Sequence, residues 1–304
     1  MKQNVKLRRL SELSYKASLT LWNEGFSGYY ADMMRTLAQH VKYIGTANIR
    51  PEHSVVAVAD GEPVGFVLTG LRRDGGRTLA WNGGTAVVPR YRGAGVGTAM
   101  MREAIRVYEE LGVHAASLEA IMANDAAVAL YRRCGYAIRK RVLILAQPKE
   151  PAKMPLFPGG ADGGRAGSGA YALRRAHPSE AGRLRYYRGD APWCSQWPNA
   201  ADAEAALAAD GNGETAGFAL YKRSFGEDGT PRGVHLLQAG FDPARGDGRE
   251  AAAFLLAALY GSADAPVRRT ADNLPESSLA AKLLIEAGFE TAFAQYVMEL
   301  KVRP

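Results

Sequence analysis

The chain has 304 residues, of which 47% are hydrophobic, and a net charge of +7. This length is typical of about two domains, and no apolar run reaches the ~18 residues of a membrane span, so we expect a cytoplasmic protein with no membrane partner. The two cysteines, Cys134 and Cys194, give neither a disulfide framework nor a zinc-ligand spacing. We therefore expect no bound metal.

The basic residues are concentrated in the first half of the chain. Residues 1–150 carry 21 Lys and Arg against 13 Asp and Glu, and residues 151–304 carry 17 against 18. This excess indicates either an ordinary basic surface or attraction of a polyanionic ligand such as a nucleotide. No basic stripe is interleaved with aromatic residues, so we do not expect nucleic acid as a partner.

Hydrophobic periodicity predicts an α/β (α+β) unit in the first half. In chain order we expect helices at 13–24 and 31–41, strands at 54–59, 64–71 and 77–88, a helix at 95–111, a strand at 115–121, a helix at 125–133 and a strand at 136–145. Residues 147–169 are rich in Pro, Gly and Lys and are typical of a linker. We therefore predict one domain at 1–146 and a second at 170–304.

A glycine-rich turn, VPRYRGAGVGT at residues 88–98, lies between the third strand and the long helix. A turn of this kind directs several backbone N–H groups and the positive end of the helix dipole at one spot, which suits a phosphate. Its three glycines leave the backbone accessible, and Arg90 and Arg92 add positive charge at the rim. The pattern fits neither a Rossmann turn nor a P-loop, and an unspecialised turn is the alternative.

A second motif accompanies the helix at 125–133. Asn124, Ala127 and Tyr131 are spaced i, i+3 and i+7, so an amide, a methyl group and a phenol share one helix face. With the glycine-rich turn, this motif resembles the GNAT superfamily of N-acyltransferases, which implies attack of an amine on a thioester. That reaction needs an N–H donor for the oxyanion and a proton for the leaving thiolate. The backbone N–H of Val88 is our candidate donor and Tyr131 our candidate acid. The alternatives are a core position for Tyr131 and a helix-capping role for Asn124.

Together, Arg92-x-x-Gly95-x-Gly97 and Asn124-x-x-Ala127-x-x-Leu130-Tyr131-x-x-x-Gly135-Tyr136 resemble the GNAT superfamily of acetyl-CoA-dependent N-acetyltransferases over about residues 5–146. The resemblance implies a mixed, mostly antiparallel sheet flanked by helices, with acetyl-CoA as co-substrate. It also implies that the pantetheine pairs with Val87 and Val88. The pyrophosphate would lie on the amides of Arg92, Gly93, Ala94, Gly95, Val96, Gly97 and Thr98.

The acceptor side is less well defined by the sequence. Many family members carry a carboxylate on the strand before the loop, where this chain has Trp81-Asn82-Gly83-Gly84-Thr85, so the general base stays open between Glu119 and Glu24. The two adjacent glycines favour a bulge that makes room for an acceptor. The resemblance places the acceptor near the end of the first helix, where the aromatic residues are equally compatible with a core. The substrate-binding candidates are Asn23, Phe26, Tyr29, Trp81 and Asn82.

The second half resembles a degenerate copy of the first. Glu214-Thr-Ala-Gly-Phe-Ala-Leu matches Glu62-Pro-Val-Gly-Phe-Val-Leu, and Leu284 stands at the position of Tyr131. Asp247 and Glu250 place negative charge where a pyrophosphate would lie. We therefore expect two tandem GNAT-like domains, of which only the first binds the coenzyme. Trp193 and Trp197 are either exposed contact residues of the second domain or part of its core.

These observations predict an N-acetyltransferase that transfers an acetyl group directly to the amine of a small molecule or peptide in a ternary complex. We expect a monomer or a homodimer. A non-catalytic acyl-CoA-binding sensor or scaffold is the alternative, because the carboxylate expected before the loop is missing.

Overall fold

The computed structural model describes residues 5–148, 170–261 and 267–302. The chain divides into two compact units, unit 1 formed by residues 1–139 together with 297–304, and unit 2 formed by residues 140–296. Unit 1 thus takes in the C-terminal end of the chain, which the domain boundaries predicted from the sequence do not include. Those boundaries stay a prediction, and residues 149–169 of the predicted linker lie outside the described residues.

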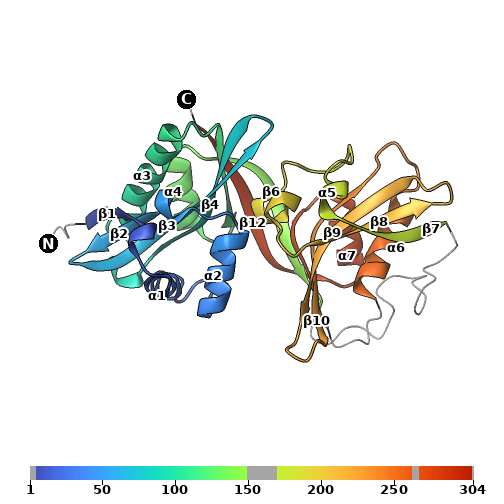
Figure 1. Ribbon diagram of the computed structural model, residues 1–304, viewed down its shortest axis with the longest axis horizontal. Helices are drawn as coiled ribbons and strands as arrows, with labels where there is room; N and C mark the ends of the chain where they lie inside the picture. The colour runs from blue at the N-terminus through green and yellow to red at the C-terminus, as the bar shows by residue number, and fades with distance from the viewer. Residues whose placement is uncertain (1–4, 149–169, 262–266, 303–304) are drawn as a thin grey trace. The chain divides into compact units, whose positions relative to one another are not determined.

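Unit 1 is a mixed sheet with helices on both faces (Figure 1). Its strands are β1 (Val5–Arg9), β2 (Val55–Ala59), β3 (Glu62–Asp74), β4 (Arg77–Val87), β5 (Ala115–Ile121) and the C-terminal end of β12 (Glu290–Lys301), in the order β1-β2-β3-β4-β5-β12. Its helices are α1 (Tyr15–Gly25), α2 (Leu37–Thr46), α3 (Val96–Glu110) and α4 (Asp125–Arg133). The pairs β1–β2, β2–β3 and β3–β4 are antiparallel, whereas the pair β4–β5 is parallel.

Helices α1 and α3 lie on opposite faces of this sheet. Phe66 of β3 stacks on Trp22 of α1, with ring centroids 5.5 Å apart. The next strand position, Gly65, lies against Met100 of α3, whose terminal carbon is 2.8 Å from where a Cβ on this glycine would be. Because successive strand residues point to opposite faces, β3 separates two apolar layers. The core of unit 1 is therefore built on both sides of β3, the strand paired with the one that leads into the site.

Helix α2 begins six residues later than predicted, at Leu37 rather than about residue 31. Thr36 is its N-cap and forms a capping box with Gln39. The preceding backbone is held elsewhere, because the amide side chain of Asn23 donates to the Arg35 carbonyl and accepts from its N–H. The sequence analysis also missed β1, a five-residue strand that pairs with β2.

Unit 2 is a second mixed sheet with helices on both faces. Its strands are β6 (Ala137–Ala146), β7 (Tyr171–Ala176), β8 (Glu204–Asp210), β9 (Thr215–Phe225), β10 (Pro231–Phe241), β11 (Arg268–Pro275) and the first part of β12, in the order β12-β6-β11-β10-β9-β8-β7. Its α-helices are α5 (Pro178–Ala181), α6 (Gly248–Tyr260) and α7 (Leu279–Glu286). Only the β10–β11 pair is parallel among the pairings observed here.

Alternate residues of β10 supply two separate cores in unit 2. Leu236 packs with residues of α6 and α7, and the next residue, Leu237, packs with Ala181 of α5. Trp193 belongs to the core, at 2% exposure, whereas Trp197 is 36% exposed. Both units thus have the mixed sheet flanked by helices that the sequence predicts. No helix in the described ranges is long and apolar enough to cross a bilayer.

Candidate active site

Strand β4 carries a bulge before the glycine-rich turn. The register of β3 and β4 shifts between Leu68↔Gly84 and Thr69↔Asn82, which leaves Gly83 as the extra residue. Gly84 lies so close to α1 that a Cβ there would be 3.0 Å from the ring of Trp22. The bulge that the two adjacent glycines favoured is thus present, and it bends β4 next to the site.

Strands β4 and β5 pair over a short stretch only, Leu79–Trp81 with Ala115–Ser117. Beyond it, one side of β4 faces α4 and the turn instead of a strand. The N–H of Val88 points the other way and donates to the Val64 carbonyl at 2.9 Å. Val88 is therefore wrong as the oxyanion donor, because its hydrogen is already used inside the sheet. In an antiparallel ladder the neighbouring residue directs its N–H to the opposite side, and that residue is Val87.

The turn itself presents the uncapped N-terminus of α3. Gly93 and Gly95 have φ values of +76° and +83°, a left-handed region that favours glycine, and a Cβ at either would meet nothing within 4 Å. Gly95 is the N-cap residue and offers no side chain to the first turn. The N–H groups at the start of the helix, which have no partner within it, therefore stay available to a ligand.

Arg92 holds the turn in place through backbone oxygens. Its Nε donates to the Val87 carbonyl at 2.9 Å and its Nη2 to the Gly25 carbonyl at 3.0 Å, at the end of α1. The Arg92 guanidinium, predicted to add charge at the rim of the phosphate site, thus donates hydrogen bonds that join β4, the turn and α1. Arg90 lies over the ring of Tyr91, with its Cζ 5.1 Å from the ring centroid. Instead, Arg133 of α4 is the second arginine that lines the cavity beside the turn.

That cavity has a volume of about 580 Å³ and lies wholly in unit 1. It is lined by the end of α1 and the segment after it, the end of β4, the turn with the first residues of α3, and α4. Of the predicted coenzyme-binding residues, it brings together Val87, Arg92, Gly93, Gly95, Val96, Gly97, Thr98, Asn124, Ala127 and Tyr131, whereas Val88 and Ala94 are not among its lining residues. Two motifs about 30 positions apart in the sequence therefore face one space.

Helix α4 closes the cavity on the side away from β4. Asn124 is its N-cap, and its Oδ1 accepts from the Ala127 N–H at 3.1 Å. Tyr131 is 7% exposed. Burial raises the pKa of the Tyr131 phenol to about 12, so the group is protonated at neutral pH. Asn124 therefore caps α4 and lines the cavity at the same time.

The segment between α1 and α2 covers part of the cavity. Phe26, Tyr29 and Tyr30 line it, and the Tyr30 hydroxyl donates to the Ala123 carbonyl at 3.0 Å, just before α4. Burial also raises the pKa of Tyr29. The other predicted acceptor residues do not line this cavity. Asn23 is engaged with the backbone of Arg35, as described above, and the Asn82 amide donates to the Thr85 hydroxyl at 2.8 Å within the bulge.

Trp81 and Glu119 form a pair on neighbouring strands. The Trp81 indole Nε1 donates to Glu119 Oε2 at 2.7 Å. Trp81 is 6% exposed, whereas Glu119 is partly exposed. The indole thus orients a carboxylate on β5, in the part of the sheet where β4 leaves its neighbour. The other candidate base, Glu24, is exposed on α1. Neither Glu119 nor Glu24 is among the residues that line the cavity.

Several lining residues were missed by the sequence analysis, including Thr85, Leu130 and Arg133. Each could have been found by extending a periodicity already used. Thr85 is two positions before Val87 on the same strand, and a strand repeats its faces every two residues. Leu130 is three positions after Ala127, so it lies on the same face of α4.

Unit 2 has a different arrangement at the corresponding turn. Arg245 pairs with Asp247 at 2.8 Å and with Asp210 at 2.7 Å, and the Tyr171 hydroxyl donates to Asp247 at 2.6 Å. Hydrogen bonds from Arg245 and Tyr171 hold the pKa of Asp247 well below its usual range. Arg249, beside Glu250 in the first turn of α6, pairs with Glu286. A carboxylate therefore sits at the start of α6, where unit 1 leaves its first turn open.

Comparison with known proteins gives one family for unit 1. Residues 16–136 match the model of the acetyltransferase (GNAT) family. A 93-residue stretch is 31% identical to N-alpha-acetyltransferase 30 of Schizosaccharomyces pombe, covering 30% of this chain and 62% of that protein. The chain therefore matches less than two thirds of this curated relative.

Solved structures match over nearly the whole chain. A GCN5-related N-acetyltransferase from Sphaerobacter thermophilus has a TM-score of 0.67 at 14% identity, covering 99% of this chain and 96% of that one. A tandem GNAT protein from the clavulanic acid biosynthesis pathway has the same TM-score and identity, covering 99% of each chain. At this identity the likeness concerns the fold, and it extends to both units.

Proposed function

From the match of residues 16–136 to the acetyltransferase (GNAT) family model, we propose that the chain transfers an acetyl group from acetyl-CoA to an amine. The observation that carries the proposal is the cavity of unit 1, where the open N-terminus of α3 and the buried phenol of Tyr131 face one space. An anion-binding end and a proton donor are what a coenzyme A thioester requires of its site.

The residues of the cavity suit coenzyme A. Its pyrophosphate would lie on the N–H groups from Gly93 to Thr98, since the positive φ values of Gly93 and Gly95 turn the backbone without placing a side chain in the way. Arg133 at the rim would add positive charge. When bound, acetyl-CoA supplies the thioester carbonyl that an amine can attack.

The chain then contributes two hydrogen-bonding groups to acyl transfer. The N–H of Val87, on the side of β4 that faces the cavity, is placed to donate to the carbonyl oxygen as negative charge develops there. Tyr131 keeps its proton at neutral pH and can donate it to the departing sulfur. A pKa of about 12 for a phenol, against ~8.5 for a thiol, makes the proton transfer uphill, so it would accompany cleavage of the C–S bond.

Glu119 is our candidate for the base that accepts the amine proton. The hydrogen bond from Trp81 of β4 fixes one carboxylate oxygen of Glu119. The Glu119 side chain therefore lies on the same face of the sheet as Trp81. Unit 2 binds no coenzyme of its own. The acceptor is a small molecule or a peptide.

The proposal is tested by mixing the purified chain with acetyl-CoA and a panel of primary amines, including short peptides. Release of free thiol that depends on the amine, together with an acetylated product in mass spectra, is the expected result. Acetyl-CoA binding with no amine-dependent thiol release anywhere in the panel would favour a non-catalytic sensor instead.

A further inference from the structure

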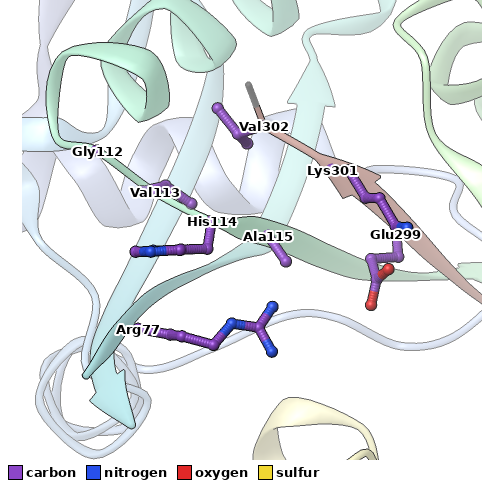
Figure 2. Close-up of a pocket in the computed structure, with 8 residues that line it drawn as sticks. All are labelled: Arg77, Gly112, Val113, His114, Ala115, Glu299, Lys301 and Val302. Carbon is purple, nitrogen blue, oxygen red and sulfur yellow. The ribbon is translucent and has the colours of Figure 1, made fainter. Parts of the chain in front are cut away.

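Unit 1 contains a second cavity, of about 310 Å³, near the start of β4 and β5. Figure 2 shows its lining residues: Arg77, Gly112, Val113, His114, Ala115, Glu299, Lys301 and Val302. In this view the side chains of Arg77 and Glu299 extend into the space beside Ala115, Lys301 lies next to Glu299, and His114 points the other way. The cavity is therefore bordered by charged groups from β4 and β12.

The charges around this cavity do not cancel. Glu299 accepts a hydrogen bond from Arg139, with Oε1 2.9 Å from Nη2, so its charge has a partner outside the cavity lining. Arg77 and Lys301 are exposed, and within the described part of the chain neither takes part in an ion pair. Two uncompensated cations beside one cavity attract an anion, and the guanidinium group can hold a carboxylate through two parallel hydrogen bonds.

Backbone hydrogen bonds fix the walls of this cavity. The His114 N–H donates to the Thr78 carbonyl at 2.9 Å, and the Val302 N–H donates to the His114 carbonyl at 3.2 Å. The Thr78 N–H also donates to His114 Nδ1 at 3.1 Å. These bonds tie the end of β12 to β5 and β4, so Arg77 and Lys301 project from a rigid base.

A strip of one sheet face connects this cavity with Glu119. Leu79 pairs with Ala115 and Trp81 with Ser117 in the parallel ladder, so Ala115, Ser117 and Glu119 share the face of Arg77 and Trp81. Ala115 and Ser117 are partly exposed and have small side chains. Ala115 and Glu119 are four strand positions apart, a distance of about 13 Å at the usual rise.

We propose that the acceptor lies along this strip, with its amine at Glu119 and a carboxylate at Arg77 and Lys301. The acceptor class is then a short extended peptide or amino-acid conjugate with a free carboxylate about 13 Å from the reacting amine, the length of about four residues. This inference rests on the proposed function, because it takes Glu119 as the amine end. It separates such an acceptor from the N-terminus of a long protein, which has no terminal carboxylate at that distance.

Calorimetric titration of the whole chain with tetraglycine and with tetraglycine amide tests the inference without relying on turnover. We expect the free carboxylate to bind about tenfold more tightly than the amide, and diglycine, which is too short to reach both ends, to show no such preference. Equal binding of tetraglycine and its amide by the unaltered chain would overturn the inference.

Charge variants locate the effect. Arg77→Gln and Lys301→Gln should each bring the ratio of the two affinities close to one, and Arg77→Glu should favour the amide. Arg73→Gln, which removes an exposed arginine that does not line the cavity, should keep the tenfold ratio. A ratio that persists in both Arg77→Gln and Lys301→Gln would place the carboxylate elsewhere and refute the proposal.

Thiol release measured on the same ligands separates the two proposals. Carboxylate-dependent binding without acetylation of any amine would contradict the proposed function and leave the anion cavity standing. Acetylation of amines with no preference for a carboxylate would do the reverse.

Discussion

Tyr131 combines two properties that an acid of the acyl-transfer step needs. It lines the cavity beside the turn, and burial raises the pKa of its phenol to about 12, which keeps the proton in place over the whole neutral range. Its ring lies 6.1 Å from that of Tyr136, a second buried phenol that does not line the cavity. Tyr131 and Tyr136 are thus both buried, but Tyr131 lines the cavity and Tyr136 does not.

Replacing Tyr131 by phenylalanine should lower turnover at least tenfold, because general acid catalysis is worth about 10² to 10⁴ in rate. Affinity for acetyl-CoA should change little, since the ring remains. Steady-state thiol release gives kcat, and calorimetry gives the affinity. Tyr136→Phe, which removes a buried hydroxyl outside the cavity, serves as the control. Equal turnover in Tyr131→Phe and the parent would remove this residue from the mechanism.

His40 gives unit 1 a dependence on pH. Its Nε2 lies 2.9 Å from the Ser18 hydroxyl, and burial, followed by the charge of Arg35, lowers the pKa of His40 to about 4. The folded chain therefore resists protonation at this site, whereas the unfolded chain takes up a proton near pH ~6.5. Stability is thus fully present above the unfolded pKa and is lost as the pH falls from about 6.5 to about 4.

We expect the melting temperature to fall over this interval, by an amount that corresponds to ~1 to 3 kcal/mol at pH 4. His40→Gln should flatten the dependence, at the cost of a lower melting temperature at pH 7. His53→Gln, at a half-buried histidine of the same unit, serves as the control substitution. Parallel melting curves for His40→Gln and the parent between pH 7 and pH 4 would contradict this account.

At the scale of elements, the site is made where β4 ends and α3 begins. The bulge at Gly83 bends the strand, Arg92 ties the turn to the end of α1, and two left-handed glycines leave the first turn of α3 open. Every one of these features acts through the backbone. Substitutions in the turn should therefore affect coenzyme binding through backbone geometry and access.

Gly95→Glu should abolish coenzyme binding, because it fills the open space at the helix N-terminus and brings negative charge to the expected position of the pyrophosphate. The substitution also forces a non-glycine residue to a φ of +83°. Gly61→Glu controls for that strain, since Gly61 has a φ of +88° in a hairpin turn with open space around it. Calorimetry with acetyl-CoA should show parental affinity for Gly61→Glu and none for Gly95→Glu, with both variants folded by circular dichroism.

Much of the element order was predictable, and the misses have a common cause. The strands β2 to β5 and the helices α1, α3 and α4 lie close to their predicted ranges, because their periodicity and end signals are local. Helix α2 was placed too early, since the Thr36 cap and the contact of Asn23 with Arg35 decide where it starts. Strand β1 is short and half exposed, and only its pairing with β2 defines it.

At the scale of the whole molecule, the two units keep similar sheets but differ at the turn. Unit 1 presents an open helix N-terminus, whereas in unit 2 Asp247 occupies the start of α6 and is held there by Arg245 and Tyr171. Leu284, which the sequence match of the two halves aligns with Tyr131, is fully buried. Packing positions and ligand positions respond to different constraints, so a fold can persist after its site is lost.

The chain should therefore bind one molecule of acetyl-CoA. Calorimetric titration of the whole protein is expected to give a stoichiometry near one, and near zero for Gly95→Glu, because the Asp247 carboxylate at the N-cap of α6 repels a pyrophosphate. A stoichiometry near two, or tight binding that survives in Gly95→Glu, would show that the turn of unit 2 is a working site.

The sequence by itself determined the two motifs, the side of α4 that lines the cavity, and the resemblance to the GNAT family. These depend on spacing within one strand, turn or helix, and such spacing is a local property of the chain. Only the tertiary structure decided that the Val88 N–H donates to the Val64 carbonyl and that Arg92 donates to the Gly25 carbonyl. The same holds for the hydrogen bond by which Trp81 orients Glu119, and for the place of residues 297–302 in unit 1. Each of these depends on the register of segments far apart in the chain, which packing of the whole sheet sets and local patterns do not encode.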